Sequence, residues 1–94
     1  MEKILNEGTL LFEVERGLVI VGINPSLDDY PISYFDRYKD KELIFQNPDG
    51  TIVKSKVIDV EVMNSLIDKK NIAFLLPISL KGHIQPKAAV FIEE

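Results

Sequence analysis

The sequence predicts a small all-β domain, a six-stranded antiparallel β-barrel in which residues 1–94 form a single unit. Three observations lead to this fold class. Apolar segments of strand length recur along the chain, residues that favour turns separate them, and hardly any stretch has helical periodicity. The chain also lacks cysteine, so a hydrophobic core rather than a disulfide framework must stabilise the fold.

The first two predicted strands form a hairpin. In residues 9–15, "TLLFEVE", side chains alternate at the period of a strand with one buried face. Gly17 supplies the turn residue, and residues 18–23 are an apolar run short enough to be a well-covered strand. We therefore expect the chain to reverse direction around Arg16 and Gly17.

A second hairpin is predicted over residues 41–57, with "NPDG" at residues 47–50 as its turn. Proline presets φ, aspartate can bond its own backbone, and glycine accepts a positive φ. These three properties together favour a tight turn at this position.

The strand after this turn changes phase. Its inward positions are odd-numbered up to Val57 and even-numbered from Ile58 onward. A strand cannot change phase without an extra residue or a bend, so we expect a bulge or corner near these two residues. Two further strands, residues 71–78 and 88–93, complete the predicted barrel, and Pro77 stops the first of them.

Charge restricts the function. The net charge of −4 and a pI near 4.9 argue against broad, charge-driven binding of nucleic acid. We expect the lysines of the second half to lie on solvated strand faces or to protect sheet edges. They are Lys54, Lys56, Lys69, Lys70, Lys81 and Lys87. No signal peptide or membrane-spanning stretch is recognisable, so we expect a cytoplasmic protein without a membrane partner.

Four segments in order resemble one known module, the β-barrel second domain of translational GTPases of the elongation factor Tu type. The segments are "VERG" (14–17), "VIDVEVM" (57–63), "NIAFLL" (71–76) and "IQPKAAV" (84–90), and the resemblance covers residues 8–23 and 43–92. It implies a free-standing barrel of the translation-protein type. In that family the barrel contacts transfer RNA and the ribosome.

The departures from the family limit what can be carried over. Glu13 stands where the family has an arginine, which reverses a charge. No G-x-x-x-x-G-K-[ST] motif occurs in this sequence, so we expect a barrel without the GTPase domain, and neither GTP hydrolysis nor a cofactor. Residues 24–41 form an insertion about a dozen residues longer than a tight connection needs.

This insertion contains all three tyrosines of the chain and is the predicted partner-binding segment. A short helix capped by Asp28 or Asp29 would place the tyrosines, which are four residues apart, on one face. Phe35 and Tyr34 are expected to complete the core, whereas Tyr30 and Tyr38 are expected to point outward as anchors. The candidate site residues are Tyr30, Tyr34, Phe35, Arg37 and Tyr38.

We do not expect an enzyme. His83 is the only histidine, and no nucleophile or orienting acid can be paired with it. The acidic residues of the insertion match no known metal-binding spacing, so no metal site is expected.

Three functions remain open, all of them non-catalytic. The first is an adaptor or regulator that binds a protein partner through residues 24–41 and the adjacent barrel edge. The second is a translation-linked module that contacts RNA through the lysines of the second half. The third is a small acidic immunity-type inhibitor that neutralises a basic toxin. Homodimerisation through an exposed strand edge is a further possibility.

Overall fold

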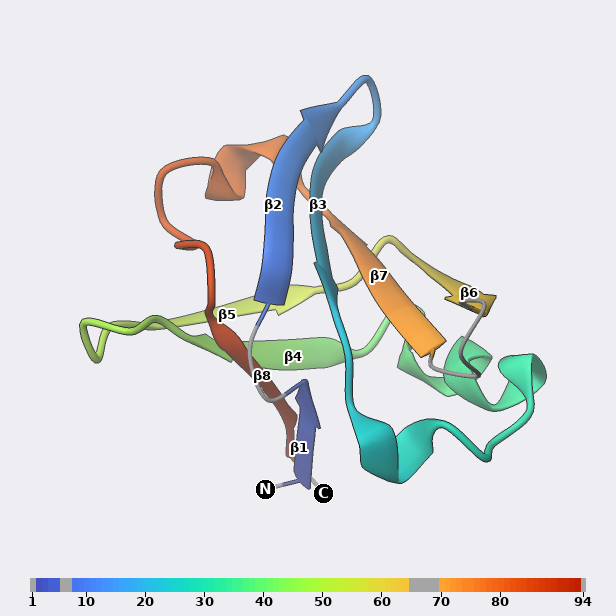
Figure 1. Cartoon of the computed structure of the whole chain (residues 1–94). Coiled ribbons are helices and arrows are strands. Elements are labelled where there is room, and N and C mark those ends of the chain that lie inside the picture. Colours follow the sequence, from blue (N-terminus) through green and yellow to red (C-terminus); the bar gives the residue numbers. More distant parts are fainter. Residues whose placement is uncertain (1, 6–7, 65–69, 94) are drawn as a thin grey trace.

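The computed structural model describes residues 2–5, 8–64 and 70–93. Within these ranges, eight strands form two antiparallel sheets of four strands each (Figure 1). The first sheet has the order β1-β8-β4-β5, with β1 at Glu2–Leu5, β8 at Ala89–Ile92, β4 at Glu42–Gln46 and β5 at Ile52–Lys56. The second has the order β2-β3-β7-β6, with β2 at Gly8–Val14, β3 at Gly17–Gly22, β7 at Lys70–Leu76 and β6 at Asp59–Asn64.

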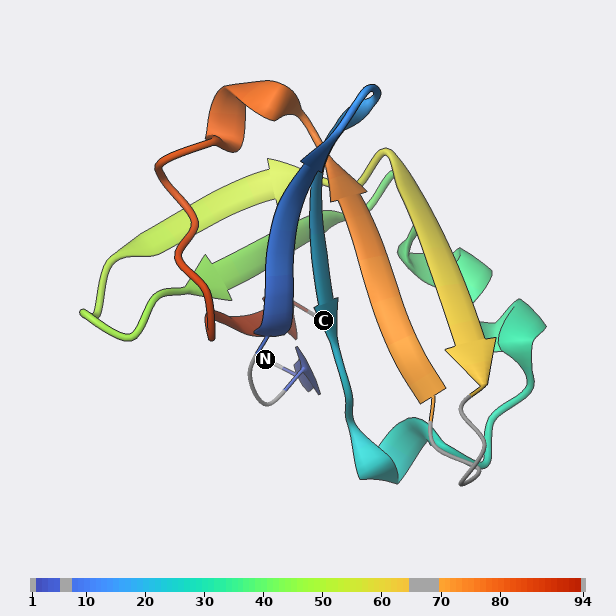
Figure 2. The same ribbon diagram turned by 45° about the horizontal axis from the view of Figure 1, so that its top comes forward.

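The antiparallel, mostly β fold is confirmed, but the prediction of a closed six-stranded barrel is wrong. The two sheets cover each other with their strands running in different directions (Figure 2). Two differences account for the strand count. β1 is only four residues long and too short to show a period, and the long strand after the second turn divides into β5 and β6.

The expected corner at Val57 is confirmed. The Val57 backbone N–H donates to the Lys41 carbonyl oxygen at 3.0 Å, beside the first sheet. One residue later the Ile58 N–H donates to the Leu75 carbonyl oxygen at 2.8 Å, in the second sheet. The chain therefore changes sheets within two residues, and buried Val57 fills the bend.

Both predicted hairpins form. Val14 pairs with Gly17 to close the β2–β3 hairpin. In the β4–β5 hairpin, the Asn47 N–H donates to the Thr51 carbonyl oxygen at 2.8 Å, and Gly50 has a φ of +92°. Glycine adopts this left-handed conformation without the steric cost that a Cβ would add.

The core lies between the two sheets. Alternate residues of β3 and β7 on one side face alternate residues of β4 and β8 on the other, as the strand period requires. The largest of these buried side chains are Ile20, Ile72, Phe74 and Leu76 from the second sheet and Leu43, Phe45 and Val90 from the first. The insertion adds Leu27, Phe35 and Tyr38 to the same cluster.

The insertion folds into two 3₁₀-helices, η1 (Pro25–Leu27) and η2 (Ile32–Tyr38). A short helix is thus confirmed in η2, which contains Tyr34 and Tyr38, but its N-cap is Pro31, without a side-chain cap hydrogen bond, rather than Asp28 or Asp29. Asn24 is the N-cap of η1, where its side chain accepts the Ser26 backbone N–H at 3.1 Å. The buried Asn24 amide also donates to the Ile4 carbonyl oxygen at 2.8 Å, which ties β1 to the start of the insertion. No helix within the described ranges is long and apolar enough to cross a membrane.

Candidate binding groove

The outer face of the second sheet, the face turned away from the core, carries an apolar groove. The strand register brings Phe12, Val19 and Leu75 side by side across β2, β3 and β7. Leu10, Val21 and Ala73 form the neighbouring row. Because successive side chains of a strand point to opposite faces, both rows face away from the inward Leu18, Ile20 and Phe74.

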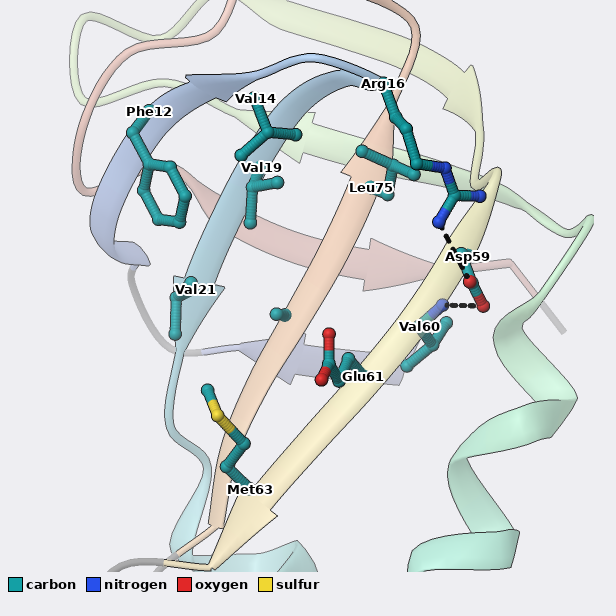
Figure 3. Close-up of a pocket in the computed structure, with 11 residues that line it drawn as sticks. Phe12, Val14, Arg16, Val19, Val21, Asp59, Val60, Glu61, Met63 and Leu75 are labelled. Atoms are coloured by element: carbon teal, nitrogen blue, oxygen red, sulfur yellow. Dashed lines mark hydrogen bonds and ion pairs between the residues drawn. The ribbon is translucent and has the colours of Figure 1, made fainter.

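We call this feature the β2–β6 groove (Figure 3). Its cavity has a volume of about 240 Å³. Its lining residues are Phe12, Val14, Arg16, Val19, Val21, Asp59, Val60, Glu61, Met63, Ala73 and Leu75.

The floor of the groove is a second apolar cluster, separate from the core. Val19, Val21 and Leu75 are each less than a tenth exposed, and Ala73 packs against them. The walls are far more open, since Phe12 is 43% and Met63 51% exposed. Large apolar side chains around an apolar hollow on a solvent-facing sheet are typical of an interaction site.

The β6 side of the groove is acidic. The Asp59 carboxylate accepts the Val60 backbone N–H at 2.9 Å and lies 3.7 Å from the Arg16 guanidinium (Figure 3). Glu61 is exposed, and among the described residues no cation lies within ion-pair distance of it. The groove can therefore accept an apolar group together with a positive charge beside Glu61.

Three of the five predicted site residues pack into the core or against it. Phe35 is 1% exposed, and half-buried Tyr34 packs against the core cluster, so both complete the core as predicted. Tyr38 is also 1% exposed, and the prediction that it points outward is wrong. A 3₁₀-helix has three residues per turn, which puts Phe35 and Tyr38 on the same buried face. Tyr30 is 43% exposed, as predicted.

Tyr30 and Arg37, the exposed residues among the five, both pack against the Tyr34 ring. Tyr30 stacks on the Tyr34 ring with a centroid distance of 4.3 Å, and the Arg37 guanidinium lies 4.2 Å from the same ring. Tyr34 also meets Tyr38 edge to face at 6.2 Å. The five predicted site residues thus form one packed aromatic cluster, from which only Tyr30 and Arg37 offer substantial surface to a partner.

The Tyr38 hydroxyl is a buried polar group without a hydrogen-bond partner among the described residues. Burial raises the pKa of this phenol far above its usual range. The hydroxyl is therefore protonated at all physiological pH values.

The described lysines of the second half lie on different elements of the fold. Lys54 and Lys56 are exposed on β5, an edge of the first sheet, which fits the expected protection of sheet edges.

The other described lysines of the second half lie elsewhere. Lys70 is 9% exposed, and its ammonium donates to the Asp28 carbonyl oxygen. Lys81 lies 3.0 Å from Glu13. Lys87 has a positive φ in the loop before β8, and Lys69 lies outside the described residues.

His83 lies exposed in the loop between η3 (Ile78–Leu80) and β8. Its carbonyl oxygen accepts a hydrogen bond from the Asn47 amide, which is a structural contact. Within the described ranges, no three acidic or histidine side chains lie close enough to hold a metal ion.

The groove was not identified from the sequence, although a signal for it exists. Residues 18–23 of β3 are apolar at consecutive positions, and β3 is buried along its whole length. A strand that is apolar on both faces indicates that both faces are covered. Here one face is covered by the core and the other by the groove walls.

Comparison with known proteins identifies no relative, since no family model, no curated protein and no solved structure matches this chain.

Proposed function

We propose that this protein is a non-catalytic binding module that docks a segment of a protein partner in the β2–β6 groove. The observation that carries the proposal is the apolar cluster of Val19, Val21 and Leu75 on the outer face of a sheet, with exposed Phe12 and Met63 as its walls. A solvent-facing sheet without a partner normally carries polar side chains at such positions.

The charges around the groove favour one kind of occupant. We propose an extended segment that places an apolar side chain on the floor and a lysine or arginine beside Glu61 and Asp59. The net charge of −4 adds a long-range attraction for a basic partner. This acidic side favours the immunity-type inhibitor of a basic effector over an RNA-contacting module as the second candidate function.

The tyrosine segment has a supporting role in this proposal. η2 packs against β6, the strand that carries Asp59, Glu61 and Met63. Of the five predicted site residues, Tyr30 and Arg37 are the exposed ones and could contact a partner directly, because Phe35 and Tyr38 are buried and Tyr34 is half-buried.

A displayed library of short random peptides tests the groove without knowledge of the natural partner. We expect the selected peptides to combine an apolar residue with a basic one. Phe12→Ser and Met63→Ser should each abolish their binding, because both substitutions remove a wall of the groove. Glu61→Gln should weaken binding and reduce its dependence on salt.

The matched control is Ile52→Ser, since Ile52 is 61% exposed but lies on β5, in the other sheet. This variant should bind the selected peptides like the wild type. If the groove variants retain wild-type binding, or if the library yields no binder, the proposed docking site is wrong. A confirmed groove would then justify affinity capture from a lysate with Phe12→Ser as the negative control.

A relation to the second domain of translational GTPases also remains a proposal, with a cytoplasmic location. The β2–β3 hairpin at "VERG" and the corner before "VEVM" support it, since each lies at one of the four segments that carry the resemblance. Co-sedimentation with ribosomes at increasing salt tests a role in translation. Association that weakens steeply with salt would support that role, whereas no association at low salt would argue against it.

A further inference from the structure

The four edge strands of the two sheets are protected to very different degrees. β5 carries exposed lysines, and β1 is only four residues long. β6 has η2 packed against it, as seen beside this strand in Figure 2. All three are recognised ways of preventing an edge from pairing with another chain.

β2 has one charged side chain, Glu13, which lies 3.0 Å from Lys81, but among the described residues it has no lysine of its own and no helix packed along it. It is seven residues long, lies at an edge and, among the strands that the structure describes, pairs with β3 alone. Leu10, Phe12 and Val14 project from it on the outer face and are 59%, 43% and 39% exposed. In an antiparallel pair, every second residue directs its N–H and C=O groups toward the neighbouring strand. The residues between them in β2 therefore direct these groups away from β3 and the sheet.

We propose that β2 pairs antiparallel with β2 of a second copy of this chain, with Phe12 of one copy opposite Phe12 of the other. The two outer sheets then form one continuous sheet. Leu10 lies opposite Val14 of the second copy, and Leu11 lies opposite Glu13. Because Phe12 and Val14 also line the β2–β6 groove, variants of Met63, which lies in the groove but not on β2, distinguish this inference from the proposed function.

The charges of β2 select this register. A shift of the two-fold axis to residue 13 would place Glu13 opposite Glu13 of the second copy, and like charges directly opposite each other are destabilising. A shift to residue 11 would place Val14 opposite Gly8 and leave it without an apolar partner. Only the axis at Phe12 pairs all three exposed apolar side chains with apolar neighbours and opposes no like charges.

Sedimentation equilibrium from micromolar to millimolar protein tests the proposal. We expect the wild type to be a dimer and both Phe12→Lys and Phe12→Glu to be monomers, because each variant opposes like charges at the axis. An equimolar mixture of the two variants should restore the dimer, since lysine then faces glutamate. This complementation depends on residue 12 meeting residue 12.

Met63→Lys is the matched control, because Met63 lines the same groove but lies on β6. It should remain a dimer. A monomeric wild type, a monomeric Met63→Lys variant, or a mixture that stays monomeric would each overturn the proposal. Should the Phe12 variants fail to fold, amide exchange on the wild type decides. Outward N–H groups of β2 must become protected as protein concentration rises, and no such protection also overturns it.

Discussion

The side-chain amide of Asn47 donates a hydrogen bond of 2.8 Å to the backbone carbonyl oxygen of His83. This contact joins the turn of the β4–β5 hairpin to the loop that leads into β8, 36 residues further along the chain. The Asn47 side-chain oxygen, Oδ1, in turn accepts the Gln85 backbone N–H at 2.8 Å. One buried side chain thus satisfies two backbone groups of a loop that has no regular secondary structure.

Replacing Asn47 with alanine should lower the free energy of unfolding by about 1–3 kcal/mol, because the partly buried His83 carbonyl and Gln85 N–H lose their partner. Chemical denaturation of the purified variant measures this loss. Gln46→Ala is the control, since Gln46 is the exposed neighbour in the chain and should change stability by less than about 0.5 kcal/mol. Equal losses in the two variants would contradict this structural role.

The same turn makes stability depend on pH. The Thr51 hydroxyl, the Thr51 backbone N–H and the Gln85 side-chain amide all donate to the Asp49 carboxylate and lower its pKa. Because the folded pKa lies below the unfolded value of about 3.9, this contribution is fully present above the unfolded pKa. It is lost as the pH falls through the folded pKa.

We therefore expect the melting temperature of the wild type to fall more steeply with acid than that of Asp49→Asn, which cannot titrate at this position. The difference between the two curves isolates Asp49 from the other carboxylates. A carboxyl-detected NMR titration gives the folded pKa directly. An Asp49 pKa at or above the usual value would contradict the hydrogen bonds described here.

Tyr38→Phe should stabilise the protein. It removes a buried hydroxyl that has no partner among the described residues and keeps the ring that packs edge to face on Phe74 at 6.1 Å. Relief of this desolvation should raise the free energy of unfolding by about 1 kcal/mol, which thermal denaturation can detect. A loss of stability would instead mean that the hydroxyl is hydrogen-bonded in solution, for which the neighbouring Tyr34 hydroxyl is the nearest candidate.

Tyr38→Ala should lower the free energy of unfolding by about 3–5 kcal/mol, because it leaves a cavity in the core. Tyr30→Ala is the matched control, since Tyr30 is 43% exposed and should cost far less. This pair of variants also tests whether Tyr38 packs in the core while Tyr30 lies at the surface. Similar effects of the two substitutions would contradict the internal position of Tyr38.

The sequence predicts most strands of this fold, because strand period and turn chemistry are local properties. The corner is the clearest case, since the change from odd to even positions at Val57 and Ile58 reports a change of sheet directly. β1 is not predicted, because a four-residue strand gains its stability from pairing with β8 at the other end of the chain. Whether the sheets close into a barrel likewise depends on contacts between residues that are far apart in the sequence.

The candidate site is harder to predict for a related reason. The prediction that the three tyrosines share one face assumed an α-helical period. The segment instead forms a 3₁₀-helix, and this turns Tyr38 inward. The β2–β6 groove combines residues of four strands, and only the register of β2, β3, β7 and β6 brings them together. No short segment of the sequence contains that arrangement.

Gly17 is the position at which the β2–β3 hairpin depends most on a missing side chain. It has a φ of +154°, and a Cβ built there would lie 2.2 Å from the Leu76 carbonyl oxygen of β7. Gly17→Ala should therefore combine backbone strain of about 1–2 kcal/mol with a further overpacking cost of about 1–3 kcal/mol. Chemical denaturation measures the sum.

Gly82→Ala separates the two contributions, because Gly82 has a φ of +85° but nothing lies within 4 Å of its Cβ position. This variant should show the backbone strain alone and lose about 1–2 kcal/mol. The larger loss in Gly17→Ala then measures the contact between the hairpin and β7. Since β3 forms the groove floor together with β7, the same substitution should also weaken peptide binding in the groove, whereas Gly82→Ala should leave it unchanged. Equal stability losses in the two variants would contradict the close approach of Gly17 to β7.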